Sequence, residues 1–134
     1  KETVMKLINS VIYSSFISYL FISATQAAAD PICDVTAQSF AHIQQRHCTA
    51  GVQASQFLPQ YCATIQDAQQ FCEQVQNATN KSRTVQPDSR IRYDANLGMV
   101  VGTQQEKCAR LIIKPNGEVV TQFPELNGAP GNCF

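Results

Sequence analysis

The chain has 134 residues, of which 44% are hydrophobic and 15% charged, and ten basic residues balance ten acidic ones. This length suits one domain at most, with enough apolar residues to bury a core. Neutrality excludes a nucleic-acid binder that relies on a strongly basic overall charge. Residues 80–114, however, carry seven basic residues against three acidic ones, which permits either an anionic ligand on one surface or an ordinary solvated face.

The N-terminal segment is typical of a secretory signal. Lys6 precedes a mostly apolar stretch, residues 7–24, and Ala27 to Ala29 offer small residues where a signal peptidase requires them. We expect residues 1–29 to be a signal peptide, with a short upstream extension before Met5, and residues 30–134 to form a secreted or periplasmic domain. The alternative is an uncleaved membrane anchor, but the many Asn and Ser residues disfavour a span, which needs about 20 mainly apolar residues. We therefore expect no stable membrane span after cleavage.

All six cysteines lie in the predicted mature domain. An even number in a small exported domain is typical of three disulfides, and the sequence leaves their pairing open. No Cys-x-x-Cys occurs, and the adjacent His47 and Cys48 rarely share one zinc in proteins, so we expect neither a metal nor another cofactor. The predicted disulfide cysteines are Cys33, Cys48, Cys62, Cys72, Cys108 and Cys133.

Two helices are expected in the first half of this domain. The first begins at Asp34–Thr36, where side-chain oxygens can accept hydrogen bonds from the first turn, and it ends before Gly51. The second begins at Thr64, which with Asp67 resembles a capping box, and apolar residues at helical spacing continue it to the polar segment 77–82.

The second half of the domain changes from helical to alternating periodicity. Asn116-Gly117 between two apolar runs is a strong hairpin signal, whereas residues 94–96 resemble a turn. We expect an α+β fold in which two N-terminal helices pack on a four-stranded antiparallel meander, stabilised by disulfides. The expected strands lie near residues 90–93, 97–101, 108–114 and 118–123.

Two motifs, in this order, carry a family resemblance. The first is residues 42–47 (His-Ile-Gln-Gln-Arg-His) at the expected helix end, and the second is residues 117–124 (Gly-Glu-Val-Val-Thr-Gln-Phe-Pro). Together they resemble the small metal-independent ribonuclease domains of bacterial polymorphic and contact-dependent toxins, in the grouping that includes barnase, EndoU-like toxins and RNase colicins. The resemblance spans residues 40–124. The chain departs from these domains in its many cysteines, its own signal and the absence of a further histidine found in EndoU-type sets.

The resemblance implies an endoribonuclease that promotes attack of the RNA 2′-hydroxyl on phosphate, with His47, His42, Arg46 and Thr121 as candidate catalytic residues. Such chemistry needs a base that takes the 2′-hydroxyl proton, a cation or donor that stabilises charge on the phosphate oxygens, and an acid that protonates the leaving 5′-oxygen. Five helical residues leave His42 and His47 about 140° apart, so both cannot face one substrate on a regular helix. We favour His47 as the catalytic histidine, because it lies where the expected helix ends. His42 is the second candidate, or a residue that orients the helix against the sheet.

Substrate contacts are expected from the strands. Arg90 and Arg92 are candidates to clamp phosphate, and Tyr93 and Phe123 to stack on a base, although solvated arginines and core aromatics are the ordinary uses of such residues. Strict alternation places Thr121 on the same strand face as its apolar neighbours at 119 and 123.

The expected partners are RNA and a cognate immunity or inhibitor protein, and the chain is expected to be monomeric. The alternative function is a non-enzymatic exported binding module, such as a periplasmic inhibitor or immunity protein. The enzyme hypothesis requires His47 Nε2, Thr121 Oγ1 and an arginine to converge on one cleft, with His47 pointing towards the strand face that carries Thr121.

Overall fold

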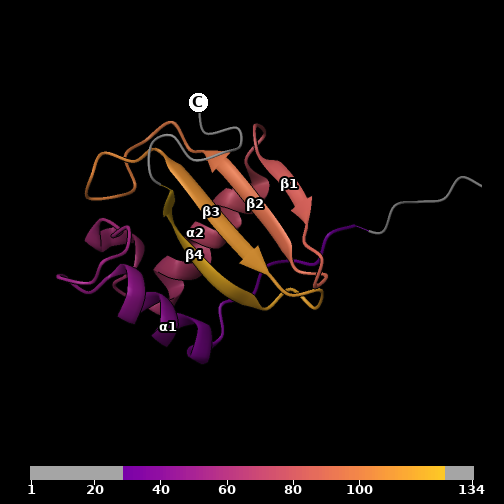
Figure 1. The fold of residues 1–134 in the computed structure, drawn as a ribbon, viewed down its shortest axis with the longest axis horizontal. Helices are drawn as coiled ribbons and strands as arrows, with labels where there is room; N and C mark the ends of the chain where they lie inside the picture. The colour runs from indigo at the N-terminus through magenta and orange to yellow at the C-terminus, as the bar shows by residue number, and fades with distance from the viewer. Residues whose placement is uncertain (1–28, 126–134) are drawn as a thin grey trace, which may run out of the picture.

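The computed structural model describes residues 29–125, so almost all of the predicted signal segment, and Cys133, lie outside the described residues. The described chain has an α+β fold with a four-stranded antiparallel sheet, as the sequence predicts (Figure 1). Its elements are α1 (Ala37–His47), the short 3₁₀ helix η1 (Pro59–Tyr61), α2 (Ile65–Asn77), β1 (Ser82–Val85), β2 (Ile91–Asn96), β3 (Cys108–Ile113) and β4 (Val119–Glu125). Within residues 29–125, no helix is long and apolar enough to cross a membrane.

Side-chain caps fix the beginning of both helices. The Thr36 hydroxyl accepts a hydrogen bond from the Ser39 amide at 3.2 Å, at the start of α1. At α2, Thr64 Oγ1 accepts from the Asp67 amide at 3.1 Å, while Asp67 Oδ2 accepts from the Thr64 amide at 2.8 Å. The predicted capping box is therefore confirmed, and it satisfies amides that a helix start otherwise leaves unpaired.

The sheet has the order β1-β2-β3-β4, each strand antiparallel to the next. The predicted hairpin joins β3 to β4, with Gly117 at φ +95°, a backbone conformation that glycine adopts without steric cost. Two predicted boundaries are wrong. Residues 94–96 continue β2 rather than forming a turn, and residues 97–101 form a loop in which the Gly98 amide donates to Asn96 Oδ1 at 2.9 Å. The fourth strand is instead β1, a mostly exposed edge strand.

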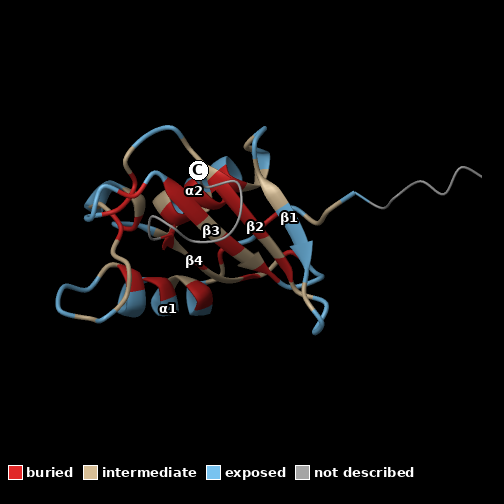
Figure 2. Ribbon diagram, turned by 45° about the horizontal axis from the view of Figure 1, so that its top comes forward, coloured by how far each residue is buried: buried red, intermediate tan, exposed pale blue. Residues whose placement is uncertain are grey.

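The core lies between α2 and one face of the sheet (Figure 2). Phe71 and Val75 of α2 belong to the same buried cluster as Tyr93 and Leu111 of the central strands. Gln122 of β4 also faces this side, because its Nε2 donates to the Ala68 carbonyl of α2 at 2.8 Å. Helix α1 lies alongside β4, at the edge of the sheet (Figure 1).

Two disulfides tie the helices to the chain around them. Cys33–Cys72 joins the segment before α1 to α2, and Cys48–Cys62 joins the end of α1 to the end of η1, with Cα–Cα distances of 6.3 and 6.2 Å. Cys108 is buried in β3. Because Cys133 lies outside the described residues, the third predicted disulfide stays a prediction.

A β-bulge in β4 changes which side chains share a face. Ile112 pairs with Thr121, but the next residue of β3, Ile113, pairs with Val119, so Val120 is the extra residue. Val119 therefore faces the core, while Thr121 faces the opposite side of the sheet. The strict alternation predicted from sequence is wrong here, because it places both residues on one face.

Candidate functional site

The sheet face turned away from α2 gathers polar and charged side chains from the three strands β2, β3 and β4. Cross-strand pairs place Arg92 opposite Ile112 and Thr121, and Asp94 opposite Arg110 and Phe123. Directly paired residues of adjacent strands point to the same face. We call the following set the sheet-face cluster: Arg92, Asp94, Arg110, Thr121, Phe123 and Glu125.

Asp94 is the centre of this cluster. Its side chain is fully buried, and its two carboxylate oxygens lie 2.6 Å from Arg110 Nε and 3.0 Å from Arg92 Nε. The contact with Arg110 is a hydrogen bond, whereas that with Arg92 is an ion pair without hydrogen-bond geometry. Arg110 Nη2 also contacts the buried carboxylate of Glu125. The carboxylates hold both guanidinium groups in place on this face of the sheet.

Thr121 supplies a hydroxyl to the same face. Its Oγ1 atom is buried and has no hydrogen-bond partner among residues 29–125. Buried hydroxyls are usually hydrogen-bonded, because leaving one unpaired costs about 1 to 3 kcal/mol. Thr121 shares this face with Arg92 and Arg110, and Ile112 lies between it and Arg92 in the strand pairing.

His47, the last residue of α1, packs against this face. Its ring stacks on Phe123, with ring centroids 4.9 Å apart and 18° between the planes, and its edge meets Phe57 at 6.5 Å. Its Nδ1 atom lies 2.8 Å from the Ser55 carbonyl. Because a carbonyl only accepts, Nδ1 carries a proton and the neutral ring keeps its lone pair on Nε2.

Phe123 connects His47 to the arginines. The Arg110 guanidinium carbon lies 5.9 Å from the centroid of the Phe123 ring, whose stacking partner is His47. Helix α1 therefore contributes a histidine, and β3 and β4 contribute an arginine and a hydroxyl, to one side of the sheet. Their convergence on one cleft, which the enzyme hypothesis requires, stays a prediction.

Burial lowers the pKa of His47, while the hydrogen bond to the Ser55 carbonyl opposes that shift. The unfolded chain, with an ordinary histidine pKa near 6.5, then binds protons more readily than the folded one. The stability that this histidine contributes is complete above pH 6.5 and is lost as the pH falls towards the lower folded pKa. We expect urea titrations at pH 7.5 and 5.5 to show a drop in unfolding free energy that is smaller in His47→Phe. A drop that His47→Phe leaves unchanged, but that His42→Phe reduces, would contradict this assignment.

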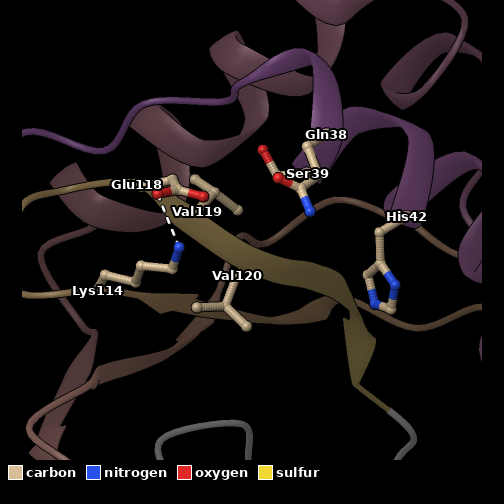
Figure 3. A pocket seen from close by; sticks show the side chains of 7 residues that line it. All are labelled: Gln38, Ser39, His42, Lys114, Glu118, Val119 and Val120. Carbon is tan, nitrogen blue, oxygen red and sulfur yellow. Dashed lines mark hydrogen bonds and ion pairs between the residues drawn. The ribbon is translucent and has the colours of Figure 1, made fainter.

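The structure places His42 and Arg46 elsewhere. His42 is exposed and lines a pocket of about 290 Å³ between α1 and β4, together with Val120 and the ion pair Lys114–Glu118 (Figure 3). Arg46 is also exposed, and its backbone carbonyl accepts a hydrogen bond from Gln56 Nε2 at 3.0 Å. No contact in the described part of the chain brings either side chain to the sheet-face cluster, so their catalytic roles stay predictions from the sequence.

Two of the predicted substrate contacts need correction. Tyr93 is fully buried on the core side, where its hydroxyl donates to Asp30 Oδ2 at 2.8 Å, so its ring is not placed to stack on a base. Arg90 precedes β2 and pairs with Asp88 at 2.6 Å rather than with the cluster. Of the predicted substrate-binding residues, Arg92 and Phe123 lie in the cluster.

Sequence reasoning missed three members of the cluster. The sequence pattern predicts Asp94 in a turn and singles out neither Arg110 nor Glu125. Arg92 and Asp94 are two apart, as are residues that share a face of a strand, so extending the strand by three residues would have revealed Asp94. The loop residue Ser55, which holds His47, carries no signal in the sequence.

The disulfide Cys48–Cys62 closes the loop that holds His47. This loop contains Ser55 and Phe57, and the Phe57 amide also donates to the His47 carbonyl at 2.8 Å. The bridge spans 14 residues, a loop length that stabilises a fold by about 3 kcal/mol. We expect the double variant Cys48→Ala/Cys62→Ala to unfold at lower urea and to return the NMR-measured pKa of His47 towards 6.5. An unchanged His47 pKa would show that the loop does not depend on the bridge.

The chain matches no protein-family model, no curated protein and no solved structure. Within residues 29–125, no group of three or more His, Cys, Asp or Glu side chains is placed to hold a metal ion.

Proposed function

We propose that this protein is an exported, metal-independent endoribonuclease whose site is the sheet-face cluster together with His47. Cleavage proceeds by attack of the RNA 2′-hydroxyl on the adjacent phosphate, which leaves a 2′,3′-cyclic phosphate and a free 5′-hydroxyl. The observation that carries the proposal is the stacking of His47 on Phe123, because it brings a proton carrier to the strand face that holds two arginines and an unpaired hydroxyl.

His47 is the proton carrier in this proposal. Nδ1 is held by the Ser55 carbonyl, so Nε2 is the atom that takes a proton from the 2′-hydroxyl. The leaving 5′-oxygen takes up a proton from water, and His47 afterwards returns its own proton to the solvent. Burial lowers the pKa of His47, which keeps the ring neutral and able to accept at neutral pH. Histidine catalysis of this kind typically contributes about 10²- to 10⁴-fold to a rate.

Arg92 and Arg110 stabilise the charge that develops on the phosphate. A guanidinium group has five N–H donors in a fixed plane, and Asp94 engages the Nε side of both groups. The fixed orientation reduces the reorganisation needed when the phosphate becomes more negative. Thr121 Oγ1 is the further hydrogen-bond donor in this proposal, and Phe123, which packs against the His47 ring and the Arg110 guanidinium, positions these two groups.

The alternative function, an exported binding module without catalysis, is favoured by the charge balance of the cluster. Asp94 and Glu125 pair with the same two arginines that would hold phosphate. Beyond the cluster, three other basic residues of the basic segment 80–114, Arg83, Arg90 and Lys114, also have carboxylate partners. A surface of paired charges suits recognition of a protein with complementary charges as well as it suits RNA.

Export is part of the proposal. Two disulfides are compatible with an oxidising compartment, the periplasm or the outside of the cell. In this proposal residues 30–134 are the mature monomeric domain, two helices on the sheet, and a cognate inhibitor protein restrains it before export.

Cleavage of RNA in the presence of EDTA tests the function. The oxidised protein is incubated with an RNA oligonucleotide and with the same sequence fully 2′-O-methylated, and the products are examined by mass spectrometry. We expect cyclic-phosphate products from the RNA and no cleavage of the methylated strand, which lacks the attacking hydroxyl. Intact RNA after prolonged incubation would refute the enzyme and leave the binding module.

A further inference from the structure

Two consecutive tripeptides between the end of α2 and the start of β1 match the acceptor sequence for N-linked glycans, Asn-x-Ser/Thr. They are Asn77-Ala78-Thr79 and Asn80-Lys81-Ser82. We propose that Asn77 is a site of N-linked glycosylation and that Asn80 is not. The inference rests on the export that is part of the proposed function, and on no step of the RNA chemistry.

Asn77 is well placed to carry a glycan. It is the last residue of α2 and is exposed, and Thr79 two residues later is exposed in the turn that follows. Ala78 between them leaves the helix with an extended backbone, φ −59° and ψ 132°. The acceptor sequence at residues 77–79 therefore lies at the exposed end of α2, and a sugar attached to Asn77 displaces no packed side chain.

A hollow beside Asn77 gives the first sugar room. Its volume is about 400 Å³, and its lining includes Leu97 and Met99, the latter 49% exposed. Gln74 and Asn96 add amide groups to its lining. A sugar ring has a weakly polar face and a rim of hydroxyls, so a lining that mixes apolar and amide side chains suits the sugar nearest the protein.

Asn80 is a poorer acceptor of a glycan than Asn77, because its side chain is already hydrogen-bonded. Its Nδ2 atom, the atom that would carry the sugar, already donates to the Asn96 carbonyl at 2.9 Å, at the end of β2. A sugar on that nitrogen would have to fit between the turn and the strand end. Two acceptors three residues apart also place their glycans in the same space, so occupation of Asn77 disfavours Asn80.

The glycan would not obstruct the proposed RNA site. Asn77 belongs to α2, which packs on the core side of the sheet, whereas Arg92 and Thr121 lie on the opposite face. Glycosylation is therefore compatible with the proposed activity, and the two can be tested independently.

The reaction transfers an oligosaccharide from a lipid diphosphate carrier. Asn77 Nδ2 forms a bond to C1 of the first sugar, the bond between C1 and the diphosphate oxygen breaks, and the lipid diphosphate departs. The amide loses one proton, and no oxidant or reductant is needed. The Thr79 hydroxyl completes the sequence that the transferase recognises.

The test is secretion of the whole chain from a yeast host with an established secretion signal added in front, followed by intact mass measurement before and after treatment with a peptide N-glycosidase. We expect the wild-type chain and Asn80→Gln to carry one glycan that the enzyme removes, leaving Asp in place of Asn77. Asn77→Gln and Thr79→Ala are expected to carry none. A wild-type chain at peptide mass, or a glycan that persists in Asn77→Gln, would overturn the inference.

A parallel culture without the added signal reports on export alone. Absence of the protein from that medium would count against the proposed export, while the culture with the added signal still decides whether Asn77 is glycosylated. The two failures are therefore distinguishable.

Discussion

Replacing His47 with phenylalanine is expected to lower the rate of RNA cleavage by about 10²- to 10⁴-fold, the usual contribution of a positioned acid–base residue. Phenylalanine preserves the stacking on Phe123 but has no nitrogen to exchange a proton. His42→Phe, on the exposed face of the same helix, is the matched control and should change the rate less than about threefold. Cleavage is followed with a fluorescent RNA oligonucleotide in EDTA.

Loss of folding must be separated from loss of the proton carrier. The hydrogen bond from Nδ1 to the Ser55 carbonyl also disappears in His47→Phe, which leaves that carbonyl to water or unpaired. Circular dichroism and urea titration should show that the variant is folded at the assay temperature. A folded His47→Phe that keeps a tenth or more of the wild-type rate would exclude His47 as the proton carrier.

Replacing Asp94 with alanine is expected to lower the unfolding free energy by about 3 to 5 kcal/mol, because it leaves two guanidinium groups without their shared partner. Asp94 is fully buried and lies within 3.0 Å of both Arg92 Nε and Arg110 Nε. The matched control is Asp88→Ala, since Asp88 forms an exposed ion pair with Arg90. Such surface pairs contribute little to stability, because solvent screens them.

Urea midpoints of the disulfide-bonded proteins measure both changes. We expect Asp94→Ala to unfold at much lower urea, with Asp88→Ala close to wild type. Similar midpoints for the two variants would show that Asp94 is not the centre of a buried network. If Asp94→Asn restores stability but lowers cleavage, the charge on Asp94 orients the arginines as well as stabilising the sheet.

Local chemistry accounts for what the sequence could predict. The helix starts follow from Thr36 and from the pair Thr64–Asp67, because a capping side chain and its amide lie within three residues of each other. The β3–β4 hairpin follows from Asn116-Gly117 for the same reason. The α+β fold and the four-stranded sheet rest on these local signals and on the change of periodicity.

The rest depends on contacts between distant residues. Asp94 looks like a turn residue until Arg110 is placed beside it, and a carboxylate with two arginine partners is tolerated within a strand. Because Val120 is an extra residue in β4, Thr121 faces the opposite side of the sheet from Val119. No residue type in β4 predicts this bulge from the sequence. His47, at the end of α1, is held by a loop that a disulfide closes, and the sequence leaves the pairing of that disulfide open.

Binding of an uncleavable RNA analogue tests most directly whether His47 and the sheet-face cluster form one site. A 2′-O-methylated oligonucleotide is titrated into the isotopically labelled, oxidised protein, and the imidazole, guanidinium and methyl signals are followed by NMR. The account predicts that His47, Arg92, Arg110 and Thr121 shift together, with one dissociation constant, while His42 and Lys114 in the pocket beside α1 stay unchanged. Shifts confined to that pocket, or no shift at RNA concentrations that support cleavage, would contradict it.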